Sequence, residues 1–174
     1  MINVKKQMNL KNLICVALLL LVSLFSLTGC AKLNPSIAIG FKKDGSSSGE
    51  YSEAIEEFPV GETFYCAVKV KLVTDKKKAR DYTVEVIVPN TTDVQMTNSG
   101  AESKGQEHEV LEDEITHTTT IRCIMEGSKE ATDKKIMFRG IPFDEGEAKI
   151  KVNIYDKDGE LERTYFREIS FVYE

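Results

Sequence analysis

The chain has 174 residues, of which 29% are charged and 41% hydrophobic, and its formal net charge at pH 7 is −5. This length predicts one domain or two small ones, and it is too short for a two-lobed solute receptor or a barrel enzyme. The acidic balance argues against nucleic acid as a partner, because nucleic-acid recognition begins with a basic surface.

Residues 1–29 have the pattern of a secretory signal peptide. Lys5, Lys6 and Lys11 precede the apolar run 13–27, and no acidic residue occurs before Cys30. A positive segment, an apolar segment and small residues before a cleavage site are typical of such signals. The run is shorter than the ~20 residues that a membrane-spanning helix needs. The alternative is an uncleaved N-terminal anchor in which Cys30 is an ordinary thiol.

The residues around the expected cleavage site add a more specific pattern. Leu27-Thr28-Gly29-Cys30 resembles the lipobox of bacterial lipoproteins. The resemblance implies that the signal is cut before Cys30 and that Cys30 carries the lipid, with residues 30–36 as a lipidated tether. The partner of this segment would be the membrane, on its extracytoplasmic side: the cell membrane, or the outer membrane where a cell has two. Cleavage would remove three lysines and no acid, so the net charge would fall from −5 to −8.

The remainder, residues 37–174, has the alternating pattern of β-strands. In 63–73 the side chains of Phe64, Cys66, Val68, Val70 and Leu72 share one face, and this period of two indicates half-buried strands. We expect strands at 37–41, 63–73, 82–88, 94–97, 115–125, 135–139, 148–155 and 163–173, with 51–58 ambiguous, 98–113 as a surface excursion and a turn at 156–159. Short strands separated by turn signals predict an all-β fold, an antiparallel two-sheet sandwich.

Two cysteines lie within the predicted strands. Cys66 and Cys123 are expected to point inward, and their spacing resembles the inter-sheet cysteine pair of immunoglobulin domains. This resemblance implies an immunoglobulin-like sandwich and a candidate disulfide between the two. The chain departs from the antibody-type pattern, since it has no tryptophan and carries Ile121 two residues before the second cysteine. The alternative is two buried thiols, because cysteine is among the most buried residue types.

Potential metal ligands gather in one acidic stretch, residues 107–117. It contains both histidines, His108 and His117, among several carboxylates. Histidine and carboxylate groups can hold zinc or another divalent ion, but the spacing is not that of a His-Glu-x-x-His site. The chain also lacks Gly-x-Ser-x-Gly, Ser-x-x-Lys and a glycine-rich phosphate loop. We therefore expect no catalytic residues and no cofactor.

These patterns favour a non-enzymatic lipoprotein that binds a protein or a glycan at the cell surface. Two alternatives remain. One is a metal-binding or small enzymatic lipoprotein that uses residues 107–117. The other is an accessory solute-binding lipoprotein, although the chain has no room for a second lobe that could close on a ligand.

Overall fold

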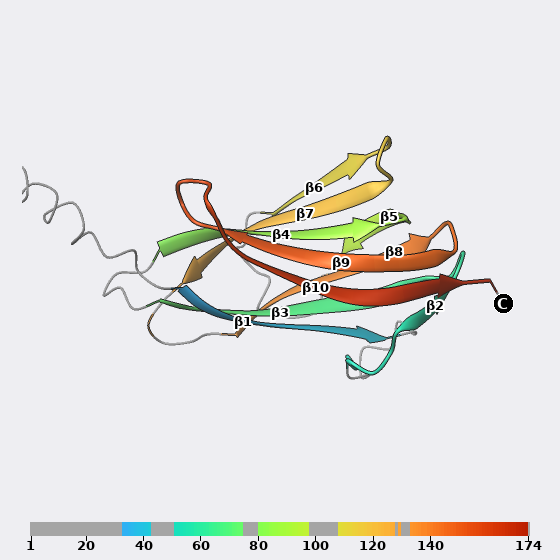
Figure 1. Ribbon diagram of the computed structural model, residues 1–174, viewed down its shortest axis with the longest axis horizontal. Helices are drawn as coiled ribbons and strands as arrows, with labels where there is room; N and C mark the ends of the chain where they lie inside the picture. The colour runs from blue at the N-terminus through green and yellow to red at the C-terminus, as the bar shows by residue number, and fades with distance from the viewer. Residues whose placement is uncertain are drawn as a thin grey trace, which may run out of the picture. The chain divides into compact units, whose positions relative to one another are not determined.

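The computed structural model describes residues 33–42, 51–74, 80–97, 108–127, 129 and 133–173. Over these ranges the chain forms two stacked β-sheets (Figure 1). The strands are β1 (Leu33–Lys42), β2 (Glu57–Pro59), β3 (Phe64–Thr74), β4 (Arg80–Pro89), β5 (Thr91–Met96), β6 (His108–Asp113), β7 (Thr118–Gly127), β8 (Asp133–Pro142), β9 (Gly146–Tyr155) and β10 (Leu161–Val172). One sheet has the order β1-β3-β8-β5, and the other has the order β2-β10-β9-β4-β7-β6.

The two sheets enclose one apolar core. Along β4 the residues Tyr82, Val84, Val86 and Val88 are buried, and the residues between them are not. The same alternation in β3, β7 and β9 turns one face of each sheet toward the other. Burying these inner faces is the main force that holds a sandwich together. The predicted all-β, immunoglobulin-like two-sheet sandwich is therefore confirmed.

Phenylalanines from both sheets meet in this core. The ring of Phe64 on β3 lies 5.1 Å from that of Phe58, 6.1 Å from Phe171, 6.3 Å from Phe138 and 6.4 Å from Phe41, measured between ring centroids. All five side chains are fully buried. The rings come from β1, β2, β3, β8 and β10, so this cluster joins both sheets.

Several element bounds differ from the sequence-based expectation. β1 begins at Leu33 rather than at residue 37, so part of the expected tether 30–36 is paired with β3. Residues 108–113 form strand β6 instead of an excursion, and β2 pairs with β10 in parallel. Every β6 residue is exposed, so its burial does not alternate and the periodicity that reveals a strand is missing. The predicted signal peptide 1–29 and Cys30 lie outside the described residues.

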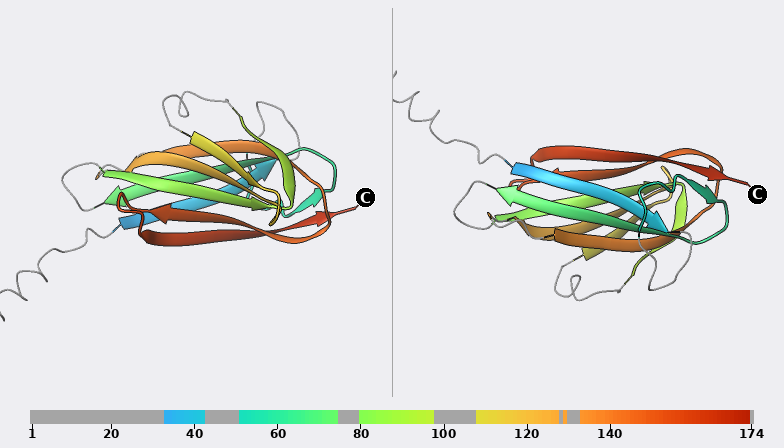
Figure 2. Two further views of the ribbon diagram at one scale, coloured as in Figure 1. Left: turned by 90° about the horizontal axis from the view of Figure 1, so that it is seen from above. Right: turned by 90° about the horizontal axis from the view of Figure 1, so that it is seen from below.

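The two ends of the sandwich differ in the segments that they carry. β1 pairs with β3 from Leu33 opposite Thr74 to Lys42 opposite Tyr65, so the chain enters the sandwich at the Thr74 end. The β4–β5, β6–β7 and β8–β9 connections lie at the opposite end, as Figures 1 and 2 show. We call this opposite end the loop end. Within the described ranges, the structure has no helix long and apolar enough to cross a membrane.

Candidate functional site

Three connections at the loop end are tied together through their main chains. The Asn90 N–H, between β4 and β5, donates a hydrogen bond to the carbonyl of His117 in the β6–β7 turn at 2.8 Å. The Phe143 N–H, just after β8, donates to the carbonyl of Asn90 at 3.2 Å. Because β5 and β8 belong to one sheet and β4 and β7 to the other, these bonds link both sheets at this end.

The backbone is strained where these connections meet. Asn90 and His117 both have φ of 50°, and Asp93 in the irregular part of β5 has φ of 51°. Positive φ is uncommon for residues other than glycine, and it costs on the order of 1–3 kcal/mol per residue in sparsely populated regions. Such strain clusters at functional sites, where the surrounding structure over-determines the backbone. The loop end is therefore the first place to look for a binding site.

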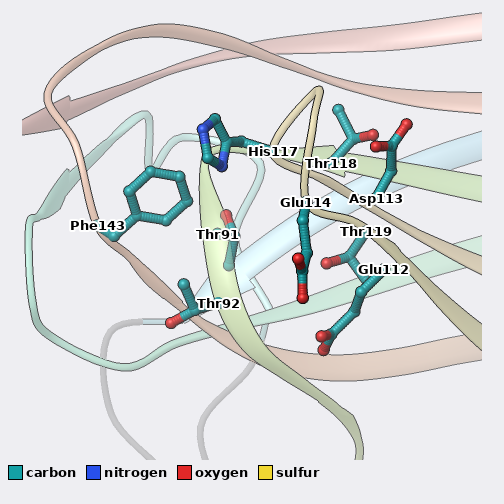
Figure 3. Close-up of a pocket in the computed structure, with 9 residues that line it drawn as sticks. All are labelled: Thr91, Thr92, Glu112, Asp113, Glu114, His117, Thr118, Thr119 and Phe143. Atoms are coloured by element: carbon teal, nitrogen blue, oxygen red, sulfur yellow. The ribbon is translucent and has the colours of Figure 1, made fainter.

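A solvent-open hollow of about 210 Å³ lies between these connections (Figure 3). Its walls combine hydroxyl groups, carboxylates and two rings: Thr91, Thr92, Glu112, Asp113, Glu114, His117, Thr118, Thr119 and Phe143. The rings of His117 and Phe143 meet edge to face, with their centroids 5.3 Å apart. The hollow thus offers charged and hydroxyl groups beside one aromatic surface.

The carboxylates of the hollow differ in whether they already have hydrogen-bond partners in the protein. Asp113 Oδ1 accepts hydrogen bonds from the N–H groups of Ile115 at 2.9 Å and Thr116 at 3.2 Å, which hold the turn. Hydrogen bonds from the Thr116 side chain and then from these N–H groups lower the pKa of Asp113. Glu112 and Glu114 form no ion pair or side-chain hydrogen bond with another described residue. Among the described residues no lysine or arginine lines the hollow, so the field of its carboxylates favours a cation.

One threonine of the wall is almost wholly buried. Thr119 is only 3% exposed as a residue, and it lines the hollow. Figure 3 shows its hydroxyl directed toward the hollow. A ligand in the hollow that offers a donor or an acceptor can hydrogen-bond to it.

The histidines of the acidic stretch do not come together. His108 is paired with Cys123 at the start of β6, whereas His117 lies in the turn beyond Asp113. A rise of about 3.3 Å per residue places His108 about 16 Å from that turn. The described residues contain no group of three or more His, Cys, Asp or Glu side chains that could hold a metal ion. An extended strand separates ligands that the sequence places close together, so the metal-binding alternative gains no support from the structure.

The cysteines of the candidate disulfide both lie in the core, on opposite sheets. Cys66 on β3 and Cys123 on β7 are fully buried, and both are free thiols. The candidate disulfide is not formed in this structure, and the pairing stays a prediction that a thiol titration tests. A disulfide needs its two Cβ atoms about 3.8 Å apart, and sequence spacing shows that two residues point inward without showing that their sulfurs meet. Burial raises the pKa of the Cys66 thiol well above its usual value and that of Cys123 to about 11.

Most residues of the hollow could not be identified from the sequence. Thr118, Thr119 and Phe143 belong to no motif, Thr91 and Thr92 belong only to the Asn-x-Thr triplet Asn90-Thr91-Thr92, and the five residues come from β5, from β7 and from the connection after β8. Two local signals were available in the sequence: Pro89-Asn90, which ends the expected strand 82–88, and the acidic residues before His117. Neither signal shows that the two segments lie side by side in the fold.

Gly140 determines how closely one wall of the hollow can pack. A Cβ atom built at Gly140 would lie 2.4 Å from Cγ2 of Thr91, which lines the hollow. We expect Gly140→Ala to lower the free energy of unfolding by about 1–3 kcal/mol through overpacking. Adding Thr91→Ser removes the obstructing methyl group and keeps the hydroxyl that donates to the Pro89 carbonyl, so the double variant should regain most of the loss. Urea unfolding of the two single variants and the double variant measures this coupling. Additive losses in the double variant would contradict the predicted clash.

No family model matches the chain, and no curated protein sequence matches it. Solved structures do match. The CARDB domain of the PF1109 protein from Pyrococcus furiosus, solved in complex with di-metal ions, is 13% identical over 79% of this chain and 89% of its own, with a TM-score of 0.45. A cohesin module of a family 33 glycoside hydrolase from Clostridium perfringens is 11% identical over 83% of this chain and 100% of its own, with a TM-score of 0.45. A non-cellulosomal cohesin from Archaeoglobus fulgidus is 13% identical over 80% of this chain and 91% of its own, with a TM-score of 0.44.

Proposed function

We propose that this protein is a lipid-anchored extracytoplasmic lipoprotein and that its sandwich is a non-enzymatic interaction module whose contact site is the hollow at the loop end. The observation that carries the proposal is the hollow itself. It is built from three connections joined by main-chain hydrogen bonds, two of which hold a non-glycine residue at positive φ. Its lining combines carboxylates, hydroxyl groups and an aromatic ring.

The position of the hollow supports a role in display. Leu33 follows Cys30 by three residues, and three residues span at most about 11 Å. A lipid on Cys30 would thus hold the Thr74 end of the sandwich close to the membrane. β1 has ten residues, a length of about 30 Å, and the hollow lies at its far end. An anchored sandwich can therefore present the hollow to the space beyond the membrane.

The anchor is tested by removing its attachment site. We expect Cys30→Ala to abolish incorporation of a palmitate analogue and to move the protein from the membrane fraction to another fraction, because stable anchoring needs acyl chains. Cys15→Ala is the matched control, since this cysteine lies within the expected signal peptide and should leave labelling unchanged. Undiminished labelling of Cys30→Ala would contradict the proposal for the anchor.

The contact site is tested by crosslinking at the surface of the protein's own cell. Glu112→Gln combined with Glu114→Gln should reduce the wild-type crosslinked species at least tenfold. Glu160→Gln combined with Glu162→Gln is the control, because this exposed pair lies beside the β9–β10 turn, away from the lining of the hollow. Equal loss in both double variants, or loss in neither, would show that the hollow is not the contact site.

A further inference from the structure

The strand that leads into the hollow is an edge strand. β6 pairs with β7 along one edge, and no strand in the described part of the chain pairs with its other edge. All six of its residues are exposed, in contrast to the alternating burial of β7 beside it. Figure 1 shows β6 as the outermost strand of the six-stranded sheet. An edge of this kind offers free N–H and C=O groups to an incoming strand.

The charge along this edge is strongly negative. Glu109, Glu112 and Asp113 lie on β6, and Glu114 follows directly. Arg122 on β7 is the neighbouring basic side chain, and it is already engaged: its Nη1 lies 3.1 Å from Glu109 and its Nη2 lies 2.9 Å from Glu85. The charges of Glu112 and Glu114 are therefore left without a basic partner among the described residues.

This charge disfavours a second copy of the chain as the occupant. In a two-fold symmetric antiparallel pair of β6 strands centred on Leu111, Glu109 of one copy would lie opposite Asp113 of the other. Like charges directly opposite each other in a sheet are destabilising. Charge complementarity instead selects a basic strand.

We propose that β6 accepts an extended segment of a basic polypeptide as an added strand, and that the ammonium or guanidinium group of one lysine or arginine of this segment enters the hollow. The inference rests on the proposed function, since it names the partner of the same site. Glu112 and Glu114 supply the counter-charge, and the Thr119 hydroxyl in the wall accepts a hydrogen bond from the cation. Phe143, which is 37% exposed, gives the apolar stem of the incoming side chain a surface to pack on.

The test uses a fluorescent synthetic peptide of alternating lysine and valine and the full-length protein in detergent solution. Wild-type protein should bind the peptide, and binding should weaken as salt is raised. The Glu112→Gln and Glu114→Gln double variant should bind at least tenfold more weakly, and the Glu160→Gln and Glu162→Gln variant should bind as the wild type does. A peptide methylated on alternate backbone nitrogens should lose binding, because it cannot donate hydrogen bonds to the edge. A glutamate–valine peptide should not bind.

The outcomes separate the inference from the function on which it rests. Loss of binding both on neutralising the carboxylates and on methylating the peptide backbone supports strand addition with a cation in the hollow. If binding is lost when the carboxylates are neutralised but kept when the peptide backbone is methylated, strand addition is overturned. If the lysine–valine peptide does not bind the wild-type protein, the inference as a whole is overturned. In that case crosslinking that still depends on Glu112 and Glu114 would leave the proposed contact site standing, and binding of a neutral oligosaccharide would assign the hollow to a glycan. Unchanged thermal unfolding of the double variant checks that these exposed substitutions leave the fold intact.

Discussion

Replacing Phe64 with alanine is expected to lower the free energy of unfolding by about 3–5 kcal/mol, the largest effect we predict for a single substitution in this protein. Phe64 is fully buried and its ring packs against four other phenylalanine rings. Alanine would lose the burial of the ring and leave a cavity between the two sheets, which the surrounding strands can only partly close. Urea unfolding followed by far-ultraviolet circular dichroism measures the loss, since the chain has no tryptophan to serve as a fluorescent reporter.

Two further variants make the Phe64 experiment decisive. Phe64→Leu keeps most of the apolar volume and should cost less than about half as much as Phe64→Ala. Phe166→Ala is the matched control, because Phe166 is 61% exposed and packs mainly under Lys149, whose Nζ lies 5.2 Å from the ring centroid. That control should cost no more than about 1 kcal/mol. Similar losses for Phe64→Ala and Phe166→Ala would contradict the placement of Phe64 at the centre of the core.

Stability should fall steeply between pH 9 and pH 11 because of the buried thiols. The core favours the neutral thiol and raises the pKa of Cys123 to about 11 from the usual 9.0, whereas the unfolded chain ionises it near its usual value. The stabilisation is fully present below pH 9 and is lost as the pH rises to the folded-state pKa. A shift of two pH units corresponds to roughly 3 kcal/mol for Cys123. The raised pKa of Cys66 adds to the loss in the same direction.

Comparison with Cys123→Ala isolates this contribution from the other groups that titrate at high pH. The variant should be less stable than the wild type at pH 7, through the loss of packing, and the difference should shrink toward pH 11. A thiol titration of unreduced, denatured protein should find Cys66 and Cys123 free. A parallel pH dependence in the variant, or a titration that finds neither thiol, would contradict the prediction and return the pair to the disulfide that their spacing suggests.

Long alternating strands could be predicted because their burial has a period of two. In β4 and β9 every second residue is apolar and buried, so the sequence shows both the strand and its inward face. The turn after β9 was equally clear: Gly159 has φ of 82°, and the Asp156 carboxylate accepts hydrogen bonds from the N–H groups of Asp158 and Glu160. Asp-Gly between two alternating segments is a strong hairpin signal.

The strands that were missed or mislocated lack this signal. β6 is exposed on both faces, and the polar start of β1 is held to β3 by backbone pairing. Backbone hydrogen bonds form regardless of side-chain hydrophobicity, so these segments carry no periodic pattern to detect. The three-residue strand β2 is too short for any period to appear.

The sequence alone determined that residues beyond the predicted signal form an acidic, all-β sandwich, because apolar alternation is a local property that each strand carries by itself. Only the tertiary structure decided where a binding site could be. The hollow arises from three connections that become neighbours when the two sheets stack, and the bonds from Asn90 to His117 and from Phe143 to Asn90 join residues distant in sequence. The acidic stretch 107–117 illustrates the same difference. Its acidic residues and histidines can be read from the sequence, but the extended strand β6 separates the two histidines and brings Glu112 and Glu114 to the hollow.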